Sequence, residues 1–250
     1  MTEAIDFDEG PEWAAALMAD GWSPMAHPLL NQEVDDHIRR CFGEADEVLH
    51  EHLSKYVHLD IHVIRPTRGR TFTTYVTSGM SDLPMKTPLQ FPEWARAELV
   101  IALPGPPETH IDTFGRRHYL IELMRSYARR PHALGTFYRL GQALDPLGES
   151  EPIGPDTGLT ACLTARPMLT PIVDSLTAFR ATLGDGAPVN FLALEPIYPD
   201  EFDVVLKHKR GAEELIERLE EAQVFELYNP ERASVARPAR GFSLKRLLGG

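Results

Sequence analysis

The spacing of apolar and polar positions divides the chain into helical and extended stretches. From residue 32 to about residue 55, apolar side chains recur every three or four residues, which predicts one long amphipathic helix. Asn31 suits its N-cap, and the acidic residues 33–36 suit its positive end. Gly43 weakens the helix slightly. The apolar face consists of Val34, Ile38, Cys41, Phe42, Ala45, Val48, Leu49 and Leu53.

After this stretch, the spacing of apolar positions changes to every second residue. Residues 57–64 alternate between polar and apolar, which predicts a half-buried strand. Residues 65–70 form a turn, and the β-branched and aromatic residues 71–77 predict a second strand that completes an antiparallel hairpin. Residues 78–85 then form a structured loop, because Gly79 can adopt a positive φ and Pro84 prevents regular structure.

The remaining chain mixes strands and helices without a repeating unit. The order predicts an α+β fold, a single domain with a mixed, largely antiparallel β-sheet covered by helices. Pro131 is expected to end the helix before it, and Gly211 to separate two helices. The predicted strands are 97–103, 159–165, 189–197 and 224–227; the predicted helices are 11–19, 117–129, a short one within 171–182, 199–209 and 212–222; residues 141–157 are a predicted loop.

Charge is uneven along the chain, since residues 1–60 are dense in Asp and Glu and the charged residues after Tyr228 are mainly basic. We expect an acidic leader with a short helix at 1–27, one domain at 28–235 and a basic tail at 236–250. The formal net charge of −12 argues against a nucleic-acid partner, since phosphate backbones favour basic surfaces. An acidic face can be merely solvated, or it can attract a basic partner.

Two cysteines cannot build a disulfide framework, so nothing in the sequence requires oxidation to fold. The N-terminus lacks the basic and apolar regions of a signal peptide, and no stretch approaches the ~20 apolar residues of a membrane helix. We therefore expect a cytoplasmic protein with no membrane partner.

Ten histidines raise the question of a metal site. His58, Asp60 and His62 would share one face of the first predicted strand. The Cα atoms of the two histidines would lie about 13 Å apart, whereas zinc holds each nitrogen at about 2.0–2.1 Å. A shared metal ion is therefore not expected, nor is any cofactor. A metal-dependent hydrolase using this face, with Asp82 nearby, remains the alternative hypothesis.

No motif for a catalytic nucleophile is present. Ser78 and Ser81 flank Gly79 but do not form a Gly-x-Ser-x-Gly elbow, and Asp82 is expected to cap the loop. The glycines at 184 and 186 lack the lysine of a phosphate-binding loop. The sequence therefore predicts no catalytic residue and no enzyme.

Several stretches, in the same order, resemble the suppressor-of-fused-like family. The loop at 78–85, Ser-Gly-Met-Ser-Asp-Leu-Pro-Met, is the most specific of them, and Ala233 departs from the proline of the last one. The resemblance covers roughly residues 57–235. The stretches are His62-Val63, Arg65-Pro66-Thr67, residues 72–77, residues 78–85, residues 97–104, residues 194–202 and residues 229–235.

The resemblance implies a protein-binding module of the bacterial single-domain type, which sequesters or neutralises a partner protein. Bacterial relatives of about this length have been proposed as immunity proteins of toxin systems, so the partner would be a toxin domain or an extended peptide that adds to a strand edge. A second interpretation of the central loop is structural, with Gly79 making a turn, Met80 and Met85 in the core and Asp82 as a cap. The candidate partner-binding residues are Thr77, Ser78, Gly79, Met80, Ser81, Asp82, Pro84 and Met85.

Overall fold

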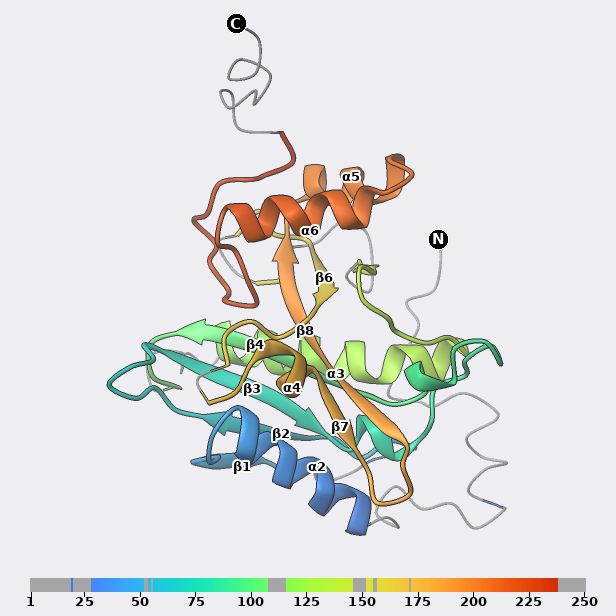
Figure 1. Ribbon diagram of the computed structural model, residues 1–250. Helices are drawn as coiled ribbons and strands as arrows, with labels where there is room; N and C mark the ends of the chain where they lie inside the picture. The colour runs from blue at the N-terminus through green and yellow to red at the C-terminus, as the bar shows by residue number, and fades with distance from the viewer. Residues whose placement is uncertain are drawn as a thin grey trace, which may run out of the picture.

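The computed structural model describes Ala19 and residues 28–51, 54, 56–107, 116–145, 152–154, 157–170 and 172–237. Within these ranges, eight strands form one sheet in the order β1-β2-β3-β4-β8-β6-β5, and β7 pairs with β8 (Figure 1). The strands are β1 Glu47–Leu49, β2 Asp60–Ile64, β3 Phe72–Ser78, β4 Ala97–Pro104, β5 Ala143–Leu144, β6 Ala161–Ala165, β7 Arg180–Thr182 and β8 Pro188–Ile197. The helices are α2 Pro28–Cys41, α3 Arg116–Leu134, α4 Ser175–Phe179, α5 Pro199–Lys207 and α6 Gly211–Glu221, with short 3-10 turns η1 Met80–Asp82 and η2 Pro92–Trp94.

The sheet is mixed, and β8 pairs with three other strands, β4, β6 and β7. Among the named strands of the described chain, β4 and β8 pair in parallel and all other pairs are antiparallel. The first half of β8 pairs with β4, and its second half pairs with β6. This arrangement confirms the predicted α+β class with a mixed, largely antiparallel sheet.

Helices cover both faces of the sheet. Alternate residues of each strand enter opposite apolar layers, so that Tyr75 packs in the layer under α3 and Val76 in the layer under α2. The α3 layer also holds Met124 and Tyr127. A third apolar cluster lies between the end of β8 and the helices α5 and α6, which pack side by side (Figure 1). Within the described part of the chain, no helix is both long and apolar enough to span a membrane.

The predicted long helix at 32–55 is wrong at both ends. The helix α2 begins at Pro28, so Asn31 lies inside it, and it stops at Cys41. Gly43 has a φ of 124°, which is outside the helical range and ends the helical path. Residues 47–49 then form β1, which pairs with β2. The apolar spacing of these residues fitted a helix, but pairing with the sheet edge decides their conformation.

The sequence predicted that Pro131 would end the helix before it. In the structure, Pro131 instead lies inside α3. A proline lacks the N–H that would bind the carbonyl four residues earlier, which here is Tyr127. The hydroxyl of Tyr138 donates to that carbonyl at 2.9 Å and replaces the missing bond. The next turn then closes through Thr136 N–H to the Pro131 carbonyl, at 2.9 Å.

The predictions for three shorter segments are also corrected. Residues 180–182 form β7 where helix was expected, and Ala143–Leu144 form β5 within the predicted loop. The predicted strand at 224–227 reduces to one bridge between Leu227 and Ala102. The predicted helix at 11–19 has only Ala19 among the described residues, and most of the leader and tail lies outside them. The division at 27 and 235 therefore stays a prediction.

Candidate functional site

The loop predicted to contact a partner forms a buried corner at the end of β3. Gly79 follows the strand with a φ of 102°, and η1 comes directly after it. Met80 and Ser81 have no exposed surface, and Pro84 is exposed. The other candidate residues, Thr77, Ser78, Gly79, Asp82 and Met85, are also buried.

Glu98 holds this corner in shape from the neighbouring strand β4. Its side chain is fully buried, and Oε2 accepts a hydrogen bond from Thr77 Oγ1 at 2.6 Å. Oε1 accepts from Gly79 N at 3.0 Å, Ser81 N at 2.9 Å and Ser81 Oγ at 2.6 Å. Burial raises the pKa of Glu98 to about 8, although the donors from Ser81 and Thr77 act against that rise. One carboxyl group therefore organises the whole loop.

Two further contacts tighten the corner. Arg96 Nη1 donates to the Asp82 carbonyl at 2.9 Å and also to the Ser81 carbonyl. His132 of α3 is hydrogen-bonded to the backbone of Met80, and burial lowers the pKa of its imidazole to about 4. A Cβ at Gly79 would collide with the carbonyl oxygen of His58, so the backbone approaches too closely for any other residue.

A second cluster joins segments from different parts of the chain. Arg232 forms a two-pronged ion pair with the fully buried Glu201, with Nη1 to Oε1 at 2.7 Å and Nη2 to Oε2 at 2.6 Å. Its guanidinium also lies 4.8 Å from the centre of the Tyr198 ring. The Tyr198 hydroxyl donates to the Arg232 carbonyl at 2.6 Å, and Glu201 Oε1 accepts from Val235 N at 2.8 Å. This clamp fixes residues 230–235 against the start of α5.

The corner leads directly into an exposed apolar surface. The loop at 85–95 is closed at its base by Met85 N to the Ala95 carbonyl, at 2.6 Å, and a turn from Pro88 to Phe91 forms its tip. Leu89 at this tip is 96% exposed and Phe91 is 42% exposed. The Phe91 ring stacks on Phe137, with centroids 6.3 Å apart, and Leu134, three residues before Phe137 in the sequence, is 46% exposed. We call these four side chains, Leu89, Phe91, Leu134 and Phe137, the apolar loop surface.

Comparison with known proteins identifies the family. The model of the suppressor of fused protein family (SUFU) matches residues 55–233, most of the chain. The chain belongs to the suppressor of fused family. No curated protein matches the sequence.

Solved structures share the suppressor of fused fold. A crystal structure of a SUFU homologue from Neisseria gonorrhoeae superposes with a TM-score of 0.57 and 21% identity, covering 84% of this chain and 98% of that one. The Sufu–Fu complex has a similar chain, with a TM-score of 0.59, 12% identity and coverage of 83% and 93%. At these identities the likeness establishes the fold.

The suppressor of fused match contains both clusters described above. The corner with Glu98 and the ion pair of Glu201 with Arg232 all fall inside residues 55–233. Within each cluster, stretches that carried the resemblance lie side by side: residues 78–85 contact residues 97–104, and residues 194–202 contact residues 229–235. The exposed loop at 85–95 lies between two of these stretches in the sequence.

Of the three residues in the hydrolase hypothesis, the structure brings His58 and Asp60 together but gives His62 other partners. Asp60 lies 3.0 Å from His50 Nδ1 and 3.1 Å from His58 Nε2. His62 instead lies 3.1 Å from both Asp35 and Ser78. Among the described residues, no group of three or more His, Cys, Asp or Glu side chains is placed to hold a metal ion.

Ser54, His58 and Asp60 approach the arrangement of a catalytic triad. Ser54 Oγ lies 2.9 Å from His58 Nδ1, and the other ring nitrogen of His58, Nε2, lies 3.1 Å from an Asp60 carboxylate oxygen. However, the Ser54 hydroxyl donates to Glu51 Oε2 at 2.6 Å, and the ion pair of Glu51 with Arg129 holds that carboxylate in place. In this arrangement the Ser54 hydroxyl is hydrogen-bonded to the Glu51 carboxylate as well as lying beside the imidazole, which differs from a simple serine–histidine pair.

The sequence interpretation missed the residues that matter most around the corner. Glu98 is the one carboxylate in an otherwise apolar strand, and such a residue needs several donors once buried, which is a usable signal. Leu89 and Phe91 stand between Pro88 and Pro92, so they could have been assigned to an irregular, exposed loop. Nothing in the sequence indicated that α3 would bring Phe137 to Phe91.

Proposed function

We propose that this protein is a protein-binding module that sequesters or neutralises a partner, as an immunity protein of a bacterial toxin system, and that it is not an enzyme. Membership of the suppressor of fused family and the fold shared with the Sufu–Fu complex support a binding role. The observation that carries the proposal is the apolar loop surface, a fixed loop that exposes 96% of Leu89 to water.

The buried corner contributes to this role by positioning. Apart from Pro84, the residues first expected to touch a partner have little surface to offer. Their hydrogen bonds to Glu98 set the direction in which the chain leaves toward Leu89. Apolar side chains on a rigid base suit an interface, because little conformational entropy is lost on binding.

The net charge of −12 adds long-range attraction for a basic toxin domain. A partner in the cytoplasm would meet the acidic surface first and then bury the apolar loop surface. In the strand order of the described residues, β1 and β5 lie at the two ends of the sheet, and a strand at such an end is a further place for an extended peptide segment to pair.

Affinity capture with matched variants tests the proposal. The tagged wild-type chain should recover one stoichiometric protein from its own cell lysate. Leu89→Asp should reduce that recovery at least about tenfold, since a charge would be buried at the contact. Leu206→Asp is the control, because Leu206 is a 65%-exposed leucine on α5. Equal loss with both variants, or no stoichiometric partner for any chain, would contradict the proposal.

A further inference from the structure

A cleft separate from the apolar loop surface opens at the other end of the β2–β3 hairpin. Its volume is about 500 Å³, which is within the range of small-molecule sites. One wall is formed by residues 42–46, which follow α2, and the other by residues 64–70. Ile172 closes one side and is 57% exposed.

Arg70 lines this cleft and joins its two walls. Its Nη1 donates to the Phe42 carbonyl at 2.7 Å, and its Nη2 donates to the Arg65 carbonyl. The side chain is only 5% exposed, and Nε has no hydrogen-bond partner. A guanidinium carries five N–H groups, so these two bonds leave donor capacity unused.

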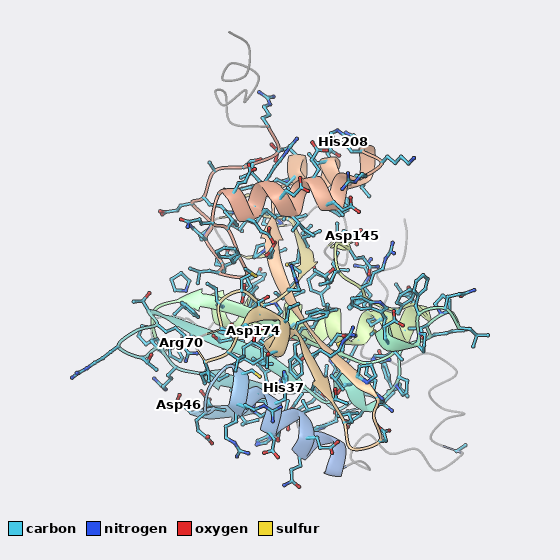
Figure 2. All side chains as sticks on the ribbon, viewed as in Figure 1. His37, Asp46, Arg70, Asp145, Asp174 and His208 are labelled. Atoms are coloured by element: carbon cyan, nitrogen blue, oxygen red, sulfur yellow. The ribbon has the colours of Figure 1, made fainter. Side chains whose placement is uncertain are left out.

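The positive charge of Arg70 is not neutralised by direct contact. Within the described residues it forms no ion pair, and Asp46 acts on it from a longer distance. Burial lowers the pKa of the guanidinium, and Asp46 partly opposes that effect. Arg70 and Asp46 lie toward the same end of the sheet (Figure 2). A desolvated arginine of this kind is a strong partner for a carboxylate, which it can hold with two parallel hydrogen bonds.

The rest of the lining limits what can bind. Phe42, Ile64, Pro66 and Ile172 supply apolar surface, whereas Glu44 and Asp46 would repel a ligand with several acidic groups. We propose that this cleft binds an apolar monocarboxylate, with the carboxylate at Arg70 and the apolar part against Ile64 and Ile172. Such a group is found in a free aryl or alkyl acid and at the C-terminus of a peptide that ends in an apolar residue.

Amide-detected NMR titration of the full chain tests this site directly. The first probe pair is 3-phenylpropanoate and its neutral amide. The acid should give saturable shifts at Gly43, Ile64 and Ile172, and the amide should bind about tenfold more weakly, because it lacks the charge that pairs with Arg70. Equal binding of acid and amide, shifts located elsewhere, or no binding at millimolar concentrations would overturn the proposal.

A second probe pair, acetyl-Gly-Phe with a free C-terminus and the same peptide amidated, identifies the source of the carboxylate. Tighter binding by the peptide acid assigns the cleft to a protein C-terminus, and tighter binding by the free acid assigns it to a small molecule. Both results support the shared chemistry, provided that each acid binds more tightly than its amide.

Variants at exposed positions keep the test independent of folding. Ile172→Trp should fill the cleft and reduce binding of the acid at least about tenfold. Leu176→Trp is the matched control, since Leu176 is 63% exposed on the neighbouring helix α4 and does not line the cleft. Full binding by Ile172→Trp would exclude the cleft as the site. The apolar loop surface is untouched by either change, so this result is independent of partner capture.

Discussion

At the scale of single residues, Gly79 combines two constraints that can be measured separately. Its φ of 102° disfavours any other residue, and a Cβ would also collide with the His58 carbonyl. Gly186 has a similar φ of 84° but open space around it. Comparing substitutions at Gly79 and Gly186 therefore separates the cost of backbone strain from the cost of steric collision.

We expect Gly186→Ala to destabilise the protein by about 1 kcal/mol, through backbone conformation alone. Gly79→Ala should destabilise it by about 3 kcal/mol or more, since the corner must move away from residue 58. Urea unfolding of both variants measures the two values. Equal losses of unfolding free energy would mean that the corner can move to make room for a Cβ at residue 79.

Glu98 gives the fold a pH dependence of known sign. Its pKa of about 8 in the folded state exceeds the ordinary value near 4.5, so the folded protein binds an extra proton between these values. The stability that this group contributes is fully present below pH 4.5 and is lost as the pH rises through 8, by about 1.4 kcal/mol per unit of pKa difference.

Glu98→Gln should remove this contribution, because an amide resembles the protonated acid and can still accept from Gly79 and Ser81. The free energy of unfolding of the variant, relative to wild type, should rise between pH 4.5 and pH 8. His132 has the opposite effect, because its lowered pKa means that stability is lost as the pH falls below 6.5. Both proteins contain His132, so its effect cancels when their free energies of unfolding are subtracted. Parallel stability curves for the two proteins would contradict the assignment.

At the scale of elements, two buried carboxylates, Glu201 and Glu226, hold the C-terminal segment. Arg232 fills the space between Glu201 and Tyr198, and Glu226 accepts hydrogen bonds from Met168 N at 3.0 Å and Leu169 N at 2.8 Å. Residues 226–235 are thus held by buried carboxylates at two places. The segment itself forms little regular structure.

Arg232→Met should leave Glu201 buried without its cation and destabilise the protein by about 3–5 kcal/mol. Hydrogen exchange should increase most at Val235, whose N–H is bound to Glu201. The variant Lys207→Met is a useful control, since Lys207 pairs with the exposed Asp203 on the surface of α5 and its loss should cost less than about 1 kcal/mol. Similar losses of stability in both variants would show that the ion pair of Arg232 with Glu201 contributes no more than a surface ion pair.

Element boundaries show where sequence patterns were sufficient. The apolar run at 97–103 predicted β4, because a strand that is buried on both faces is apolar throughout. The alternation before Ile64 predicted a half-buried strand, but β2 is a shorter strand whose residues 61–64 are buried on both faces, His62 included. The apolar residues 45–49 fit a helical period equally well, and only pairing with β2 makes them a strand. Pro131 was misjudged because its acceptor is satisfied by Tyr138, a long-range contact that no local pattern contains.

At the scale of the whole molecule, the sequence predicted the fold class and the family but not the exposed surface. The signature loop at 78–85 was recognised as special, and its buried residues turn out to determine shape. The four side chains of the apolar loop surface come from two segments, Leu89 and Phe91 on one and Leu134 and Phe137 on the other, and the stacked rings of Phe91 and Phe137 join the two. A contact between separate elements cannot be inferred from the periodicity of either one.

The central claim is that the apolar loop surface contacts a partner protein. Site-specific photo-crosslinking in living cells tests it most directly, with p-benzoylphenylalanine placed at Leu89 or at the exposed Leu206 of α5. We predict one discrete protein adduct from position 89 and none from position 206. No adduct at position 89, or the same adducts from both positions, would contradict the account.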